Sequence, residues 1–217
     1  MIDLHNHEAK SDSSLQLINV FAQDLPLPSD EHIYSIGLHP WHLELVDNEH
    51  CLQLMEQAMD QKNILAIGEC GIDKAITTGF AWQERYFIKQ AELAEKYSKP
   101  LIIHCVRAFY DLIRLKKKIK ASVPWIIHGF QGNEKILSAL IQHDFYFSVS
   151  KHILTNPHKK DILPLVPVDH LFFETDNHDL SISEIYALAS KILNTDEETL
   201  EAIIAKNFKR LFEWPSS

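Results

Sequence analysis

Side chains of the kinds that bind metal ions follow short apolar runs at several widely separated points of the chain. His5 and His7 close the first run, and residues two apart in an extended strand point to the same face. The other candidates stand singly at the ends of later runs, at Glu69, His104, His128 and Asp176. Four imidazoles and two carboxylates are enough ligands for two divalent cations ~3.5 to 4 Å apart.

A structural role must be weighed against this metal-binding role. A single histidine at a strand end is more often a hydrogen-bonded structural residue than a ligand, and His-x-His alone is a weak signal. The joint placement favours a metal centre, because each polar group buried without a partner costs about 1 to 3 kcal/mol. Imidazole ligands favour Zn, Mn, Fe, Co or Ni, and Mg remains possible in an assay.

The elements that must position these residues can be predicted from the apolar runs themselves. Runs that are apolar without interruption are typical of strands buried on both faces of a parallel sheet. Stretches of helical periodicity lie between most of them, and Thr195 with Glu198 predicts a capping box for the last helix. This alternation predicts a (β/α)8 barrel of the TIM type, whose C-terminal rim would gather the candidate ligands. The eight runs are residues 2–4, 15–21, 33–38, 64–67, 101–103, 125–127, 145–149 and 171–173.

The beginning of the chain departs from a regular barrel. The gap from Glu8 to Ser14, and the proline-containing gap between Phe21 and Ile33, lack the ~10 residues that a covering helix requires. We therefore expect a distorted barrel, in one domain over residues 1–217, that lacks one or two of its first outer helices. Strands left uncovered there would expose apolar surface, which predicts a homodimer or a protein partner.

Composition excludes several classes of protein. Lys and Arg number 21 against 30 Asp and Glu, a net charge of -9, which is the wrong sign for binding nucleic acid by bulk charge. Cys51, Cys70 and Cys105 form no Cys-x-x-Cys pair and suit a reducing compartment. No signal peptide or membrane-spanning run is visible, so we expect a cytoplasmic protein without membrane contact.

Six motifs in a fixed order carry a resemblance to a known family. They are Asp3-Leu4-His5-Asn6-His7, Gly37-Leu38-His39-Pro40, Ala66-Ile67-Gly68-Glu69-Cys70-Gly71-Ile72-Asp73, Ile103-His104-Cys105-Val106-Arg107, His128-Gly129-Phe130-Gln131-Gly132 and Glu174-Thr175-Asp176. With these motifs the chain resembles the TatD-related metal-dependent hydrolases, as a compact member. The segment from Asn207 to Phe212 also looks like the closing helix of that family.

The resemblance implies a two-metal phosphodiesterase, a 3'-5' exonuclease or deoxyribonuclease that acts on single-stranded 3' ends of DNA or RNA. It implies that His5, His7 and Asp176 bind one ion, that His104 and His128 bind the other, and that Glu69 bridges them. The chemistry agrees, because a hydroxide held between two cations is available near neutral pH. Asp176 could then act as the general base beside Glu69 as the second catalytic carboxylate.

Four further residues near these motifs are candidates for binding or support. Arg107 could hold a phosphate oxygen with its planar fork, or it could be a rim arginine paired to a carboxylate. His39 is expected to face the substrate, and Asp73 either supports a ligand or braces its loop. Trp41 could stack a base, although ordinary packing is the more frequent role.

Two features leave the substrate open. Asn177-His178-Asp179 stand where the family usually has a proline, so the wall beside Asp176 can differ. The opening segment with Ser11-Asp12 also resembles PHP-type phosphoesterases, but nothing later in the chain supports that family. A metal-dependent amide or ester hydrolase, such as a deacylase of aminoacyl-nucleic acid, and a non-catalytic barrel subunit of a larger assembly remain alternatives.

Overall fold

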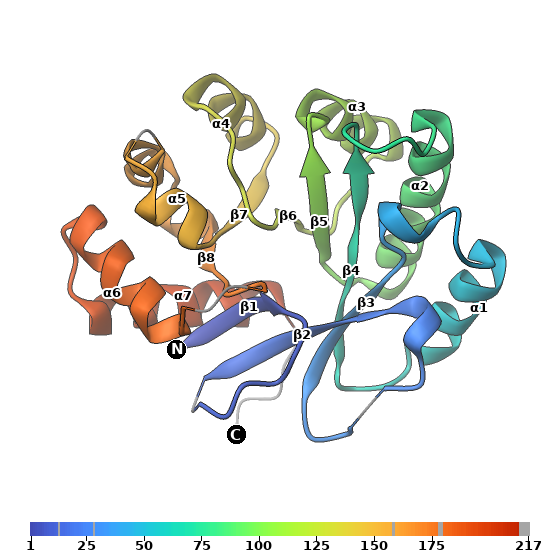
Figure 1. Cartoon of the computed structure of the whole chain (residues 1–217), viewed down its shortest axis with the longest axis horizontal. Coiled ribbons are helices and arrows are strands. Elements are labelled where there is room, and N and C mark those ends of the chain that lie inside the picture. The colour runs from blue at the N-terminus through green and yellow to red at the C-terminus, as the bar shows by residue number, and fades with distance from the viewer. Residues whose placement is uncertain (13, 28, 158, 178–179, 213–217) are drawn as a thin grey trace. The chain divides into compact units, whose positions relative to one another are not determined.

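Eight strands form one sheet in the order β1 to β8, as expected from the eight apolar runs (Figure 1). The computed structural model describes residues 1–12, 14–27, 29–157, 159–177 and 180–212. The strand pairs β1–β2, β3–β4, β4–β5 and β7–β8 are parallel, and a bridge joins Asn6 to Asp176. Parallel strands in sequence order, with the first beside the last, confirm the prediction of a TIM-type barrel fold. The strands are β1 (Ile2–Asn6), β2 (Leu15–Phe21), β3 (Ile33–Gly37), β4 (Ile64–Asp73), β5 (Leu101–Val106), β6 (Trp125–Ile127), β7 (Phe145–Val149) and β8 (Leu171–Phe173).

Helices follow the later strands but not the first ones. In the described part of the chain, the segment between β1 and β2 contains no helix, and the segment between β2 and β3 contains only the short 3-10 helix η1 (Ala22–Asp24). The predicted lack of early outer helices is therefore confirmed. The others are η2 (Pro40–His42), α1 (Asn48–Ala58), α2 (Phe80–Tyr97), α3 (Phe109–Ile119), α4 (Glu134–Ile141), α5 (Lys151–Thr155), η3 (Lys160–Leu165), η4 (Val168–His170), α6 (Ile182–Leu193) and α7 (Glu197–Leu211).

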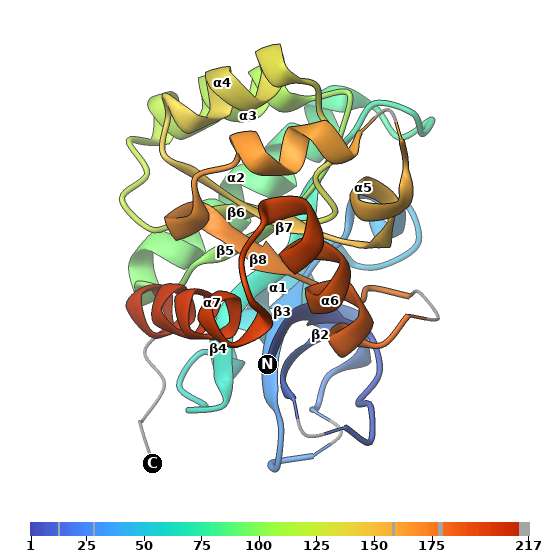
Figure 2. The same cartoon turned by 90° about the vertical axis from the view of Figure 1, so that its left-hand side faces the viewer.

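The chain divides into two compact units, residues 1–18 with residues from 127 onward, and residues 19–126. In the first unit, α6 and α7 lie side by side against β8 (Figure 2), and the Phe173 and Tyr186 rings pack 4.9 Å apart. In the second unit, α2 packs on β4, and the Phe87 and Trp125 rings lie 5.2 Å apart. Each unit thus has aromatic core packing of its own, and a single domain over residues 1–217 stays a prediction.

Strand β4 runs past its expected end at residue 67 as far as Asp73, so Glu69 lies within the strand. The reason is a close approach to β5 that only glycine allows. Gly71 has a φ of +157°, and a Cβ there would lie 1.9 Å from the carbonyl oxygen of His104. At Gly68, with a φ of +150°, a Cβ would likewise lie too close to the backbone of Ile102. Without side chains at these positions, the backbone that carries Glu69 can lie directly against the backbone that carries His104.

Two expectations about the ends and faces of elements are wrong. The N-cap of α7 is Asp196, whose side chain accepts a hydrogen bond from the backbone N–H of Thr199, so Thr195 and Glu198 form no capping box. The first strands also do not expose apolar surface: β1 is buried throughout, and β2 is buried except at its two end residues. Contacts with α7 account for part of the cover on β1. The homodimer or protein partner therefore stays a prediction, without the support that exposed apolar strands would have given it.

None of the helices in the described residues is long and apolar enough to cross a membrane. The cytoplasmic location stays a prediction from the sequence.

Candidate metal centre

In the first unit, β1 and the residues after β8 bring three predicted ligands together. His5, His7 and Asp176 each offer one ligand atom, and these atoms all lie within 4.8 Å of one another. The backbone fixes this arrangement, because the N–H of Asp176 donates to the carbonyl oxygen of His5 at 2.9 Å. Although burial raises it, contacts with His7, His5 and His128 lower the pKa of the Asp176 carboxyl to about 2. Asp176 is therefore a carboxylate at neutral pH, as a metal ligand must be.

Another predicted ligand of this unit, His128, lies against the same cluster. Its ring centre is 4.4 Å from that of His5, and its Nδ1 lies 3.5 Å from Oε1 of Glu174. The Glu174 side chain is fully buried. A carboxylate beside one ring nitrogen orients an imidazole and leaves the other nitrogen for a metal ion. Glu174 had no predicted role of its own, although its place directly after an apolar strand was a usable signal.

A buried aspartate holds the two strand ends of this cluster in place. Asp3 is 1% exposed and accepts hydrogen bonds from the backbone N–H of Thr175 at 2.9 Å and from its hydroxyl at 2.6 Å. Asn6 donates to the same carboxylate at 3.2 Å. Because Asp3 precedes His5 by two residues and Thr175 precedes Asp176, these bonds set the spacing between two predicted ligands. The supporting role of Asp3 was also not predicted from the sequence.

In the second unit, Glu69 is the centre of a separate cluster. His39, Glu69 and His104 each offer a ligand atom within 4.8 Å of the others. Oε1 of Glu69 lies 3.1 Å from Nε2 of His39 and 2.9 Å from Nδ1 of His104. The side-chain oxygen of Asn19 accepts a hydrogen bond from the backbone N–H of Glu69 and thereby fixes the strand at this point.

His39 is held as a neutral imidazole with a defined tautomer. Burial lowers its pKa to about 4, against the opposing influence of the Glu69 carboxylate. Its Nδ1 accepts a hydrogen bond from the backbone N–H of Trp41 at 3.2 Å, so the ring proton resides on Nε2. Nε2 therefore donates to Glu69. In this arrangement both ring nitrogens of His39 are engaged, and the residue orients the Glu69 carboxylate.

Asp73 supports His104 and also braces its own loop, so both roles considered for it are present. Its Oδ2 lies 3.3 Å from Nε2 of His104 and accepts a hydrogen bond from the indole N–H of Trp41 at 2.8 Å. Its Oδ1 accepts the backbone N–H of Ala75 at 2.8 Å. Burial alone would raise the pKa of Asp73, but the bonds from Trp41 and Ala75 and the nearby His104 lower it. Asp73 is therefore an ionised acceptor beside a predicted ligand.

Arg107 follows β5 directly and is exposed. Its φ is +55°, an uncommon value for a residue with a side chain. Among the residues that the structure describes, Arg107 forms no ion pair. Among the described residues no carboxylate pairs with Arg107, so the alternative of a rim arginine in an ion pair is not observed there.

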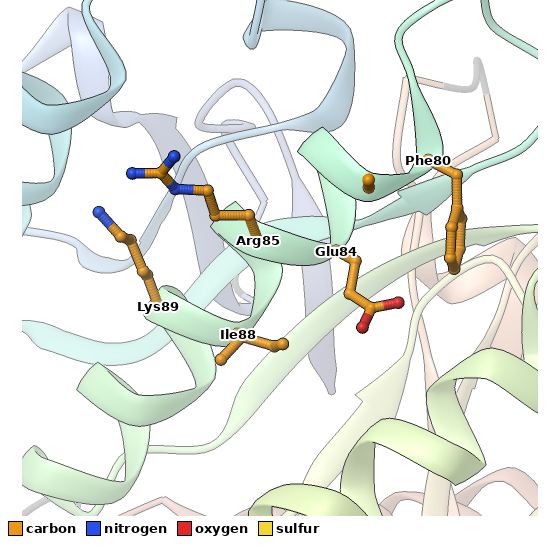
Figure 3. Close-up of a pocket in the computed structure, with 6 residues that line it drawn as sticks. Phe80, Glu84, Arg85, Ile88 and Lys89 are labelled. Atoms are coloured by element: carbon orange, nitrogen blue, oxygen red, sulfur yellow. The ribbon is translucent and has the colours of Figure 1, made fainter.

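Other features of the two units lie outside these clusters. Cys70 is buried and Cys105 is partly buried, and burial raises the pKa of the Cys105 thiol to about 12. A hollow of about 450 Å³ is lined only by residues of α2, with Arg85 and Lys89 on one side and Glu84 and Phe80 on the other (Figure 3). Asn177 is described, whereas His178 and Asp179, the rest of the departure from the family pattern, lie outside the described residues.

The donor set fits a divalent transition metal. Each cluster combines imidazole nitrogen with carboxylate oxygen, the ligands that Zn, Mn, Fe, Co and Ni accept. The carboxylates are held by hydrogen bonds from neighbouring residues, as is usual for metal ligands.

Comparisons with known proteins agree with this geometry. The sequence profile described as TatD related DNase matches residues 12–213, a range that holds every predicted ligand except His5 and His7. An uncharacterized metal-dependent hydrolase of Haemophilus influenzae is 27% identical over 162 residues, which are 70% of this chain and 62% of that protein. The 3'-5' ssDNA/RNA exonuclease TatD of Erwinia tasmaniensis is 30% identical over 148 residues, 64% of this chain and 56% of that protein.

The matched part of the chain thus spans less than two thirds of the length of these two relatives. The crystal structure of YJJV, a TatD homologue from Escherichia coli K12, superposes with a TM-score of 0.86 at 21% identity, covering 99% of this chain and 98% of the other. That likeness extends over the whole barrel fold. Since the profile covers nearly the entire chain, this protein belongs to the TatD-related DNase family of metal-dependent hydrolases.

Proposed function

We propose that this chain is a metal-dependent phosphodiesterase that removes nucleotides from the 3' ends of single-stranded DNA or RNA. The observation that carries the proposal is a pair of clusters of potential metal ligands: His5, His7 and Asp176 form one, and Glu69 and His104, beside the orienting His39, form the other. A family relative bears the name of a 3'-5' ssDNA/RNA exonuclease, which supports this choice of bond and substrate.

The proposal includes two divalent ions of the Zn, Mn, Fe, Co or Ni type, with Mg usable in an assay. Bound ions of this kind polarise a phosphoryl oxygen and lower the pKa of a coordinated water. The individual ligand roles, with Glu69 as the bridge and with His104 and His128 on the second ion, are predictions from the family resemblance.

Three side chains of the chain itself fit the needs of this reaction. Asp176 is ionised at neutral pH and can accept a hydrogen bond or a proton from the attacking water. Arg107 has no carboxylate partner among the described residues, so its guanidinium is available for the phosphate oxygens of the substrate. His39 donates to Glu69 and orients it.

The charge of the chain limits how the nucleic acid is held. A net charge of -9 argues against a long track of phosphate contacts, and contact with a few terminal nucleotides fits it better. Affinity that depends on many phosphate contacts falls steeply with salt. We therefore expect turnover that is nearly insensitive to salt between about 50 and 200 mM.

The test compares substrates under one metal condition. Single-stranded oligonucleotides with a free 3' end, aminoacyl-nucleic acid and simple amides are offered to the wild type, to Glu69→Gln and to Glu84→Gln. Glu84 is the matched control, because it lies on α2 and pairs with Arg114. We expect loss of 3' nucleotides in the wild type and the control, and a decrease of about 100-fold or more, with lower metal content, in Glu69→Gln. Turnover only of the acyl or amide substrates, or unchanged turnover in Glu69→Gln, would overturn the proposal.

A further inference from the structure

Trp41 is a large aromatic residue that is fixed in place and yet remains exposed. It lies in η2, directly after β3, and 56% of its surface is accessible. A large aromatic ring buries much apolar surface when it packs against another group. The exposure of Trp41 leaves much of its ring surface available to a ligand.

Trp41 donates two hydrogen bonds, one to a residue of the Glu69 cluster and one to the residue that supports it. The backbone N–H donates to Nδ1 of His39 at 3.2 Å, and the indole N–H donates to Oδ2 of Asp73 at 2.8 Å. The indole thus has its polar atom satisfied on the protein side, while much of its ring surface faces solvent. A ring restrained in this way loses little conformational entropy when a ligand packs on it.

The position of the ring relates it to the proposed reaction. Its centre lies 5.0 Å from the His39 ring and 5.8 Å from the His104 ring. A base lies one sugar away from its own phosphate, so a nucleotide whose phosphate reaches the Glu69 cluster carries its base into the neighbourhood of Trp41.

Another tryptophan of the same unit shows what an ordinary exposed ring looks like here. Trp82 on α2 is 40% exposed, but its ring packs against Tyr86 at 5.0 Å, and the Arg85 guanidinium lies 5.5 Å from its centre. Its indole N–H donates to the carbonyl oxygen of Leu43 at 3.5 Å, and these ring contacts are with side chains of its own helix. Trp82 is therefore a matched control for Trp41.

We propose that Trp41 is a substrate-binding residue on which the base of a terminal, unpaired nucleotide stacks. This inference rests on the proposed nuclease function and names the part of the substrate that the site recognises. Stacking works without positive charge, which suits a chain of net charge -9. It accepts every base, because each has a π face, and it requires a base that is free of a duplex. An acyl or amide substrate without a base gains nothing from it.

The test uses pairs of single-stranded oligonucleotides that differ only in whether the 3'-terminal nucleotide carries a base or is abasic. We expect the wild type to prefer the base-containing end by roughly 5- to 150-fold in kcat/KM. Trp41→Ala should lose this preference, whereas Trp82→Ala should keep it. Trp41→Phe, which retains a ring but cannot donate to Asp73, should keep most of it.

Binding of a deoxynucleoside monophosphate, followed by quenching of tryptophan fluorescence, gives a readout that needs no turnover. We expect quenching in the wild type and in Trp82→Ala and much less in Trp41→Ala, with circular dichroism to verify that each variant folds. Equal rates on both ends in the wild type, or Trp41→Phe behaving like Trp41→Ala, would overturn the stacking role alone. Absence of cleavage of either oligonucleotide would instead refute the nuclease function on which the inference rests.

Discussion

Replacement of Gly71 by alanine tests the idea that close approach of β4 to β5 builds the Glu69 cluster. The φ of +157° is a backbone conformation that residues with a side chain rarely adopt, which costs about 1 to 3 kcal/mol. The new Cβ would also lie 1.9 Å from the carbonyl oxygen of His104, a backbone atom that cannot rotate away. Overpacking of this kind costs about 1 to 3 kcal/mol. The sum, roughly 2 to 6 kcal/mol, is a large part of the ~5 to 15 kcal/mol by which a domain is stable.

The measurement is the free energy of unfolding from urea denaturation, with metal content determined on the same samples. Gly79→Ala is the control, because nothing lies within 4 Å of a Cβ at Gly79. We expect a change of less than about 1 kcal/mol in the control. In Gly71→Ala, displacement of His104 should also weaken metal binding by about 10- to 100-fold. A Gly71→Ala protein that matches the control in both measurements would show that the close approach of β4 to β5 is not needed for the Glu69 cluster.

Three further predictions concern the hydrogen bonds that hold the start of β1, the reactivity of two thiols, and the stability contributed by bound metal. Tyr186→Phe should lower the free energy of unfolding by about 1 to 3 kcal/mol in urea denaturation, with exposed Tyr110→Phe unchanged, because the Tyr186 hydroxyl bonds both backbone groups of Ile2. The native thiols of Cys70 and Cys105 should react with a disulfide reagent at pH 8 on the order of 10³-fold more slowly than after denaturation, because burial raises their pKa and the reactive thiolate is scarce. The rate should rise with pH; fast native labelling would contradict the burial. Removal of metal by a chelator should lower the thermal midpoint, and restoring the ion at 100 times its Kd should return about 2.7 kcal/mol of stability; an unchanged midpoint would argue against bound metal.

The strands of the fold were predictable because burial on both faces leaves a mostly apolar run, and all eight runs became strands. The end of β4 was not predictable, because Gly68 and Gly71 give no apolar signal although the strand passes through both residues. The cap of α7 moved by one residue to Asp196, since several neighbouring polar side chains can each accept the same backbone N–H. Local composition thus identifies an element better than its boundary.

For the site, residue types identified the candidates, but their partners came only from tertiary contacts. The sequence could not pair Trp41 with Asp73 or His39 with Glu69, because these residues are 32 and 30 positions apart and belong to different elements. It also gave no reason to expect that the first strands would be buried without helices of their own. Which residues can bind a metal is a property of side-chain chemistry, whereas which residues orient those ligands depends on how the elements pack.

Two of the candidate residues have a backbone conformation that is uncommon for residues with a side chain. Ser98, Lys120 and Asn194 have positive φ at the ends of α2, α3 and α6, where a left-handed residue commonly closes a helix. Arg107 and Asp176, with φ values of +55° and +50°, instead follow strands β5 and β8, where no helix end explains the conformation. Such conformations cost about 1 to 3 kcal/mol, persist only where the surrounding structure holds them, and cluster at functional sites. Both are residues for which the sequence predicts roles in catalysis or phosphate binding, and both follow strands on the side of a barrel where such residues are carried.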